Sequence, residues 1–309
     1  MKKIYHIEPI YKSFVWAKEK LKDYFNIDTD QKQIGTVYHV ISVEGQLDNI
    51  VKEVGEPLST FYKNNRELFN CDSETFPIRM TTTCNEGFQS YQVHPDDEYA
   101  YIHDNKAKGK VSGSVTIEES DEVRSRKFGH KCKNLEEFKE YVETKNWDKL
   151  FNYLDVKTGD YVHTPAGVIH GGYGDGKITC TFGTNGDLTY RFYDLDRNDP
   201  KRPLRIQDVY NLQVFPDKKV SPIHVEPELK NGLYIYDYYQ EKGEYVAKRI
   251  KCEKEGTYSY PGFLFISSIN GECVVDGEKL AKGETIFVPA NYGEMHIKGN
   301  VDLILISYY

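Results

Sequence analysis

Two segments of this chain share one pattern, and that pattern constrains its fold more than any other feature. The segments GDYVHTPAGVIH and GETIFVPANYGEMH begin at Gly159 and Gly283, 124 residues apart, and each has glycine, an acidic residue and later Pro-Ala at identical offsets. Each copy predicts a turn, a strand and a tight Pro-Ala bend, which is typical of double-sheet β barrels of the jelly-roll or cupin type. Chance similarity is the alternative, but two barrels in tandem explain the repeat better.

Composition and length agree with this fold class. The chain has 309 residues, enough for one large or two medium domains, and 14% of them are aromatic, which favours β structure. We therefore expect a mainly β protein with two cupin-type (jelly-roll) barrels and a helical insertion or cap. In chain order we expect an N-terminal segment with helices that joins the first barrel (1–75), the catalytic cupin barrel (76–197) with its helical insertion (about 134–155), a connection (198–231) and a C-terminal cupin-like barrel (232–309).

Charge and sequence motifs exclude several classes of partner. The net charge is −8 and no basic stripe is clustered, so we expect no nucleic-acid partner. No apolar stretch of 18 residues and no signal peptide is found, so we expect no membrane partner and a cytoplasmic location. The six cysteines form no C-x-x-C pair, which favours free buried thiols over a zinc knuckle or a redox dithiol.

A Gln-x-His pair stands out within the segment SYQVHPDDEYAY. Gln92 and His94 lie two residues apart on a predicted strand, so their side chains point to the same face. His170 ends the first copy of the repeat, and it would meet this pair if the two strands are neighbours in one barrel. Three such neutral ligands could hold a divalent metal, and histidine nitrogen suits zinc. The alternative for any single one of these histidines is a hydrogen-bonded core residue.

Three segments together resemble type I phosphomannose isomerase, the zinc-dependent family that interconverts mannose 6-phosphate and fructose 6-phosphate. They are QVHPDDEYA, GDYVHTPAGVIH and TYRFYDLDR, and the resemblance runs nearly from end to end. It implies one zinc per chain, a small sugar phosphate as substrate, and isomerisation through an enediol. It also implies that Gln92, His94 and His170 are three of the family's four metal ligands.

The resemblance assigns two further residues and exposes one departure. Arg191 takes the position of the family's active-site arginine, with a surface ion pair to Asp194 or Asp196 as the alternative. Lys110 would add a cation at the pocket rim, or it is a solvated loop lysine. The family's fourth ligand is a glutamate, and in the segment Gly109 to Ser112 its position holds Ser112.

The missing glutamate leaves several readings open. Glu118 or Glu119 could supply the carboxylate if the alignment shifts, although both also fit solvent-facing acids. The family's lysine ahead of QVHP has no clear match, and Arg79 is the nearest cation. A working isomerase, a non-catalytic homologue that binds a sugar or a partner, and a pocket for another phosphosugar all remain possible.

Overall fold

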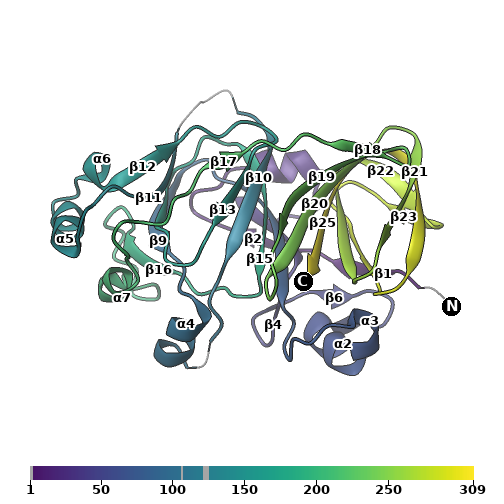
Figure 1. Ribbon diagram of the computed structural model, residues 1–309, viewed down its shortest axis with the longest axis horizontal. Coiled ribbons are helices and arrows are strands. Elements are labelled where there is room, and N and C mark those ends of the chain that lie inside the picture. Colours follow the sequence, from purple (N-terminus) through teal and green to yellow (C-terminus); the bar gives the residue numbers. More distant parts are fainter. Residues whose placement is uncertain (1–2, 106, 121–124) are drawn as a thin grey trace.

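The computed structural model describes residues 3–105, 107–120 and 125–309, and most of its regular structure is antiparallel β sheet (Figure 1). This confirms the expectation of a mainly β protein. Within the described ranges the strands form three large sheets and one short two-stranded ribbon. The ribbon pairs β4 (Ser42–Val43) with β5 (Leu47–Asp48).

Two of the large sheets form the lobe on the left and in the centre of Figure 1, which we call the first lobe. The seven-stranded sheet has the order β17 (Pro222–Ile223), β13 (Tyr161–Thr164), β10 (Ser112–Glu118), β15 (Ile178–Thr184), β8 (Ile78–Cys84), β3 (Ile34–Val40), β2 (Ile10–Ser13). The five-stranded sheet has the order β12 (Phe151–Leu154), β11 (Arg126–His130), β14 (His170–Tyr173), β9 (Phe88–Val93), β16 (Tyr190–Tyr193). Residues of both sheets line one cavity, described below.

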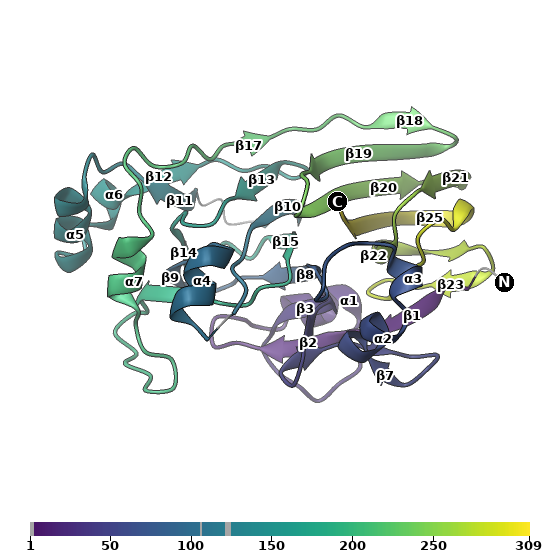
Figure 2. The same ribbon diagram turned by 60° about the horizontal axis from the view of Figure 1, so that its bottom comes forward.

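The C-terminal lobe is built on an eleven-stranded sheet. Its main path is β18 (Glu228–Lys230), β19 (Leu233–Gln240), β20 (Tyr245–Cys252), β25 (Gly293–Tyr308), β22 (Leu264–Val275), β24 (Thr285–Val288), β1 (Tyr5–Glu8), β6 (Ile50–Val51), β7 (Glu56–Pro57), while β21 (Glu255–Tyr260) pairs with β25 and β23 (Glu278–Leu280) with β22. The N-terminal segment contributes to both lobes, because β1 pairs with β24 whereas β2 pairs with β3 (Figure 2). The domain boundaries given above stay a prediction.

Short helices lie at the edges of the sheets. They are α1 (Lys20–Phe25), α2 (Leu58–Asn64), α3 (Arg66–Phe69), α4 (Asp97–His103), α5 (Leu135–Glu143), α6 (Trp147–Leu150) and α7 (Ile206–Asn211). The expected insertion at 134–155 is helical at its start, where the Asn134 side chain accepts a hydrogen bond from the Glu137 amide and caps α5. Residues 151–154 instead form strand β12, because they pair with β11.

The two copies of the repeat fold into the same turn. Gly159 and Gly283 both have φ near +88°, and their amides donate to Thr116 O and Ser268 O, each at 2.8 Å. The following acidic side chain, Asp160 in the first copy, accepts a hydrogen bond of 2.9 Å from the amide three residues earlier, and Glu284 does the same in the second copy. The glycine supplies the left-handed backbone and the carboxylate closes the turn.

Replacing Gly159 with alanine is expected to lower the free energy of unfolding by about 1–2 kcal/mol, because a Cβ at this φ strains the backbone. Space is not the reason, since a Cβ there would meet nothing within 4 Å. Urea unfolding measures the loss. Gly159→Asn is the control and should lose less, because asparagine tolerates positive φ better than alanine. Equal stability of wild type and Gly159→Ala would contradict this account of the turn.

One buried hydrophobic cluster joins the two lobes. It contains Phe182 of the seven-stranded sheet together with Phe265 and Phe287 of the eleven-stranded sheet. At the same boundary, the buried hydroxyls of Tyr161 and Tyr245 lie 2.9 Å apart.

All six cysteines are free, and five of them are buried. In the described part of the chain, no helix has the length and apolar character needed to cross a membrane.

Candidate functional site

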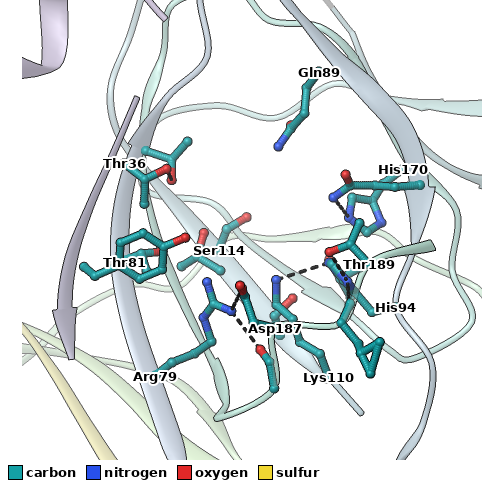
Figure 3. Close-up of a pocket in the computed structure, with 18 of the residues that line it drawn as sticks. Thr36, Arg79, Thr81, Gln89, His94, Lys110, Ser114, His170, Asp187 and Thr189 are labelled. Atoms are coloured by element: carbon teal, nitrogen blue, oxygen red, sulfur yellow. Dashed lines mark hydrogen bonds and ion pairs between the residues drawn. The ribbon is translucent and has the colours of Figure 1, made fainter. Parts of the chain in front are cut away.

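A cavity of about 1160 Å³ lies in the first lobe, between the five-stranded and the seven-stranded sheets. All five candidate site residues from the sequence line it: Gln92, His94, Lys110, His170 and Arg191. Figure 3 shows His94, His170 and Lys110 on one side of the open space. The structure therefore brings together segments that are up to about 100 residues apart in the chain.

Strand pairing explains how the Gln-x-His pair meets His170. Strands β9 and β14 are antiparallel neighbours, and His170 lies directly opposite Gln92 in their register. The Nε2 atoms of Gln92 and His170 are 3.4 Å apart, and the rings of His94 and His170 have centroids 5.0 Å apart. An amide and two imidazoles thus share one small region of the cavity wall.

The hydrogen bonds of the two histidines fix their tautomers. Nδ1 of His94 lies 2.8 Å from Leu188 O, and Nδ1 of His170 lies 3.0 Å from Val168 O. A carbonyl oxygen can only accept, so each Nδ1 carries the proton and each Nε2 keeps its lone pair toward the cavity. Burial also lowers the pKa of His94 well below its ordinary value and that of His170 to about 4, so both rings are neutral at pH 7.

Lys110 approaches His94 from the side of the seven-stranded sheet. Its Nζ lies 3.2 Å from His94 Nε2 and can donate to that lone pair. Burial, and then the Arg79 charge, lowers the pKa of Lys110 to about 7, while the Asp187 charge opposes the shift. Lys110 is therefore part of the cavity wall, and its alternative as a solvated loop lysine is wrong.

The structure places Ser112 in the cavity and rules out both suggested replacements for the missing glutamate. Ser112 is buried and lines the cavity. Glu118 instead lies 3.5 Å from Lys20, and Glu119 lies 3.4 Å from Lys177. Neither acid lines the cavity, so the idea that one of them supplies the carboxylate is wrong.

Zinc is bound by nitrogen, sulfur and oxygen ligands, usually four of them in a tetrahedral arrangement. In the described part of the chain, no three His, Cys, Asp or Glu side chains are grouped to hold a metal ion. Gln92, His94 and His170 nevertheless offer two imidazole lone pairs and, with the Gln92 amide turned over, an amide oxygen. A metal ion at His94 Nε2 would take the place of the Lys110 hydrogen bond. Three neutral N and O donors with an open fourth position fit zinc. Without a carboxylate, we expect them to hold it weakly.

Arg191 faces the cavity from β16, where it lies opposite Gln92. The proposed ion-pair partners are engaged elsewhere, since Asp194 binds Arg197 at 2.5 Å and Asp196 binds Lys145 at 2.8 Å. The surface ion pair suggested for Arg191 is therefore wrong. Its Nε is buried and has no hydrogen-bond partner among the described residues. Burial, and then the charge of nearby Arg202, lowers the pKa of Arg191.

A further cation, Arg79, is buried and lines the same cavity. Its Nη1 donates to Asp187 Oδ1 and to Gly186 O, each at 2.7 Å. Asp187 was missed in the sequence, because its partner is 108 residues away. For Arg79 a signal existed, since polar residues alternate at 79, 81 and 83 in a strand whose other residues are mostly apolar.

Changing Asp187 to asparagine is expected to cost about 1–2 kcal/mol at pH 7, because it leaves the buried Arg79 charge without its carboxylate. This cost is low for a buried ion pair, because the Asp187 side chain is 38% exposed. Burial raises the pKa of Asp187, but the Arg79 and Lys110 charges outweigh it, so the net pKa is lowered. The pair's contribution is therefore present at neutral pH and lost as the pH falls below about 4.

Urea unfolding at pH 7 and at about pH 3 measures both effects, and the Asp187→Asn variant should lose less stability on acidification than the wild type does. Asp196→Asn is the matched control, because Asp196 pairs with Lys145 at an exposed position and should change stability little. Equal losses in the two variants would show that the Arg79 pair contributes no more than a surface pair.

Known proteins similar to this chain were found by sequence and by structure, although no family model matches it. It is 33% identical over 304 residues to a mannose-6-phosphate isomerase of Streptococcus mutans serotype c (strain ATCC 700610 / UA159), covering 94% of this chain and 93% of that protein. It is 28% identical to the probable mannose-6-phosphate isomerase GmuF of Bacillus subtilis (strain 168), with 97% of each covered.

Solved structures show the same fold. The mannose 6-phosphate isomerase from Bacillus subtilis superposes with a TM-score of 0.90 at 23% identity, covering 99% of both chains. The apo form of the enzyme from Salmonella typhimurium gives a TM-score of 0.75 at 11% identity, covering 100% of both chains. The similarity in fold therefore extends over both lobes.

Proposed function

The chain belongs to the mannose-6-phosphate isomerase family, and from this membership we propose that it interconverts mannose 6-phosphate and fructose 6-phosphate. Relatives named for this activity match almost the whole chain. The observation that carries the proposal is that two neutral imidazoles, an amide and two cations from separate strands and loops line one cavity.

The reaction requires positive charge near the sugar's first two carbons. A proton moves between C2 and C1, and the enediol intermediate develops negative charge on oxygen. Lys110 can donate a hydrogen bond to that oxygen, because its Nζ is held in the cavity beside His94. Arg191 can hold the phosphate, because no described carboxylate occupies its guanidinium and that planar group binds phosphate through two parallel bonds.

Gln92, His94 and His170 are the residues that would hold one zinc ion. Bound there, zinc would orient the sugar oxygens and polarise the carbonyl. The Leu188 and Val168 carbonyls support this role, because they keep the protons of both imidazoles on the far nitrogens. The five-stranded sheet fixes the positions of Gln92 and His170 through their direct pairing.

One observation favours a second candidate, a non-catalytic homologue that binds a sugar or sugar phosphate. Ser112 stands where the family's glutamate ligand is expected, and the Lys110 ammonium lies against the lone pair of His94. The first feature removes a negative charge from the metal position, and the second places beside it an amine that is positive when protonated. A protein that only binds a sugar phosphate would tolerate this, since cations bind the phosphate.

Turnover of mannose 6-phosphate by tag-free protein separates the two candidates. An isomerase should form fructose 6-phosphate with added zinc, lose this activity in a strong chelator, and regain it when zinc is restored. Binding of mannose 6-phosphate without turnover, at any zinc concentration, would instead identify the non-catalytic homologue. A protein that neither binds nor converts mannose 6-phosphate would refute both candidates.

A further inference from the structure

The cavity wall opposite the histidines carries a regular array of neutral hydroxyl groups. In the register of the seven-stranded sheet, Thr81 lies opposite Thr181, and Thr181 lies opposite Ser114. These three residues line the cavity, and Figure 3 shows Thr81 and Ser114 across the open space from His94 and His170. We call this row the first hydroxyl row.

A second hydroxyl row follows two residues further along the strands. Thr83 lies opposite both Thr36 and Thr179, and all three line the cavity. From Arg79 to Thr83 the wall extends over four residues of β8, which is about 13 Å at 3.3 Å per residue. Arg79 stands at one end of this wall, and neither hydroxyl row contains a charged side chain.

Several of these polar groups have unused hydrogen-bonding capacity. Within the described residues, the hydroxyls of Thr81, Thr181 and Ser114 have no hydrogen-bond partner, and neither has the side-chain amide of Gln89, which lines the cavity near the second row. A hydroxyl both donates and accepts, and an amide does so too. Such a surface suits a ligand that carries many neutral hydroxyl groups.

Aromatic rings border the same end of the cavity. Phe14 and Trp16 both line it and stack on each other with centroids 4.5 Å apart and planes at 13°. Aromatic faces offer a large apolar surface for the C–H face of a sugar ring. Lys177 and Asp175 also line the cavity, and their charges offset each other, because the two side chains lie 3.3 Å apart.

The size of the cavity agrees with a ligand longer than one hexose phosphate. Pockets that enclose an entire drug-sized molecule usually measure roughly 300–1,000 Å³. This cavity measures about 1160 Å³. A hexose phosphate at the His94, Lys110 and Arg191 end would therefore leave part of the cavity unfilled.

We propose that the hydroxyl rows, Gln89 and Phe14 form a subsite for a second sugar unit, so that the preferred ligand is a disaccharide phosphate. This inference rests on the proposed function, because the reducing hexose and its phosphate occupy the histidine end. The second sugar lies along the wall formed by β8 and β15, with its hydroxyls bonded to the rows. The reducing end stays free at C1 and C2, where isomerisation takes place.

Calorimetric titration compares mannose 6-phosphate with β-1,4-mannobiose that carries the phosphate on O6 of its reducing mannose. The disaccharide phosphate is expected to bind about tenfold more tightly or better, since two additional hydrogen bonds are sufficient for that factor. Thr83→Val and Gln89→Leu should bring the ratio of the two affinities close to one. Thr116→Val is the matched control and should keep the ratio, because Thr116 lies opposite Thr179 but is buried and outside the cavity.

The outcomes separate this inference from the proposed function. Equal affinity for the two ligands, with normal turnover of mannose 6-phosphate, would overturn the second-sugar subsite and leave the isomerase intact. A tenfold preference that survives Thr83→Val and Gln89→Leu would overturn the assignment to this wall. Tight binding of the disaccharide phosphate without turnover of either sugar would support the subsite and refute the isomerase, and no binding of either ligand would refute both.

Discussion

Replacing His94 with alanine is expected to abolish stoichiometric zinc binding and to lower kcat/KM for mannose 6-phosphate by at least about 100-fold. Changing a residue that merely supports a metal ligand typically costs 10–100-fold, and loss of the ligand itself should cost more. Without bound zinc, the same Nε2 lone pair can accept a hydrogen bond from Lys110, and the variant loses this contact too. Elemental analysis and steady-state kinetics on the same preparation measure both effects.

His163 provides the matched control for this experiment. It lies seven residues before His170 in the same sequence motif, but it stacks on Tyr239 and does not line the cavity. His163→Ala should therefore keep the wild-type zinc content and turnover. If His94→Ala retained the full zinc content and activity, His94 would not belong to a metal site.

Replacing Ser112 with glutamate is expected to tighten zinc binding by at least about tenfold. The substitution supplies the carboxylate that the family's motif has at this position, and a negative ligand is attracted strongly to a dication in a buried site. Ser112 already lines the cavity, and Gly183, which lies opposite it on β15, has no side chain to obstruct a longer residue. Competition with a zinc chelator of known affinity measures the change.

Ser112→Gln is the control, because glutamine has the same shape as glutamate without its charge. It should bind zinc about as weakly as the wild type. If the glutamate and glutamine variants had equal zinc affinity, the missing charge at this position would not be what weakens the site. Higher isomerase activity in Ser112→Glu alone would further link the charge at position 112 to catalysis.

The part of the site that follows from local strand geometry could be predicted from the sequence. Gln92 and His94 lie two residues apart, so a strand places them on one face, and the Pro-Ala repeat indicated that His170 begins a strand of the same barrel. The structure pairs His170 directly with Gln92. The repeated glycine likewise predicted two equivalent turns, and both have the same φ.

The rest depends on which strands become neighbours, and no local pattern specifies this. The pair between Arg79 and Asp187 joins the start of β8 to the loop after β15, and the hydroxyl rows require β3, β8, β15 and β10 to lie side by side. Residues 151–154 were expected to continue a helical insertion, but pairing with β11 makes them a strand. Tertiary contacts override local preference at such positions.

The central claim is that Gln92, His94 and His170 hold one zinc ion in the cavity of the first lobe. Crystals of tag-free protein grown with zinc, with diffraction recorded on both sides of the zinc absorption edge, locate the ion directly. We expect a single anomalous peak about 2.0–2.1 Å from the Nε2 atoms of both His94 and His170. A cavity without such a peak, or zinc bound only at other residues, would contradict the claim.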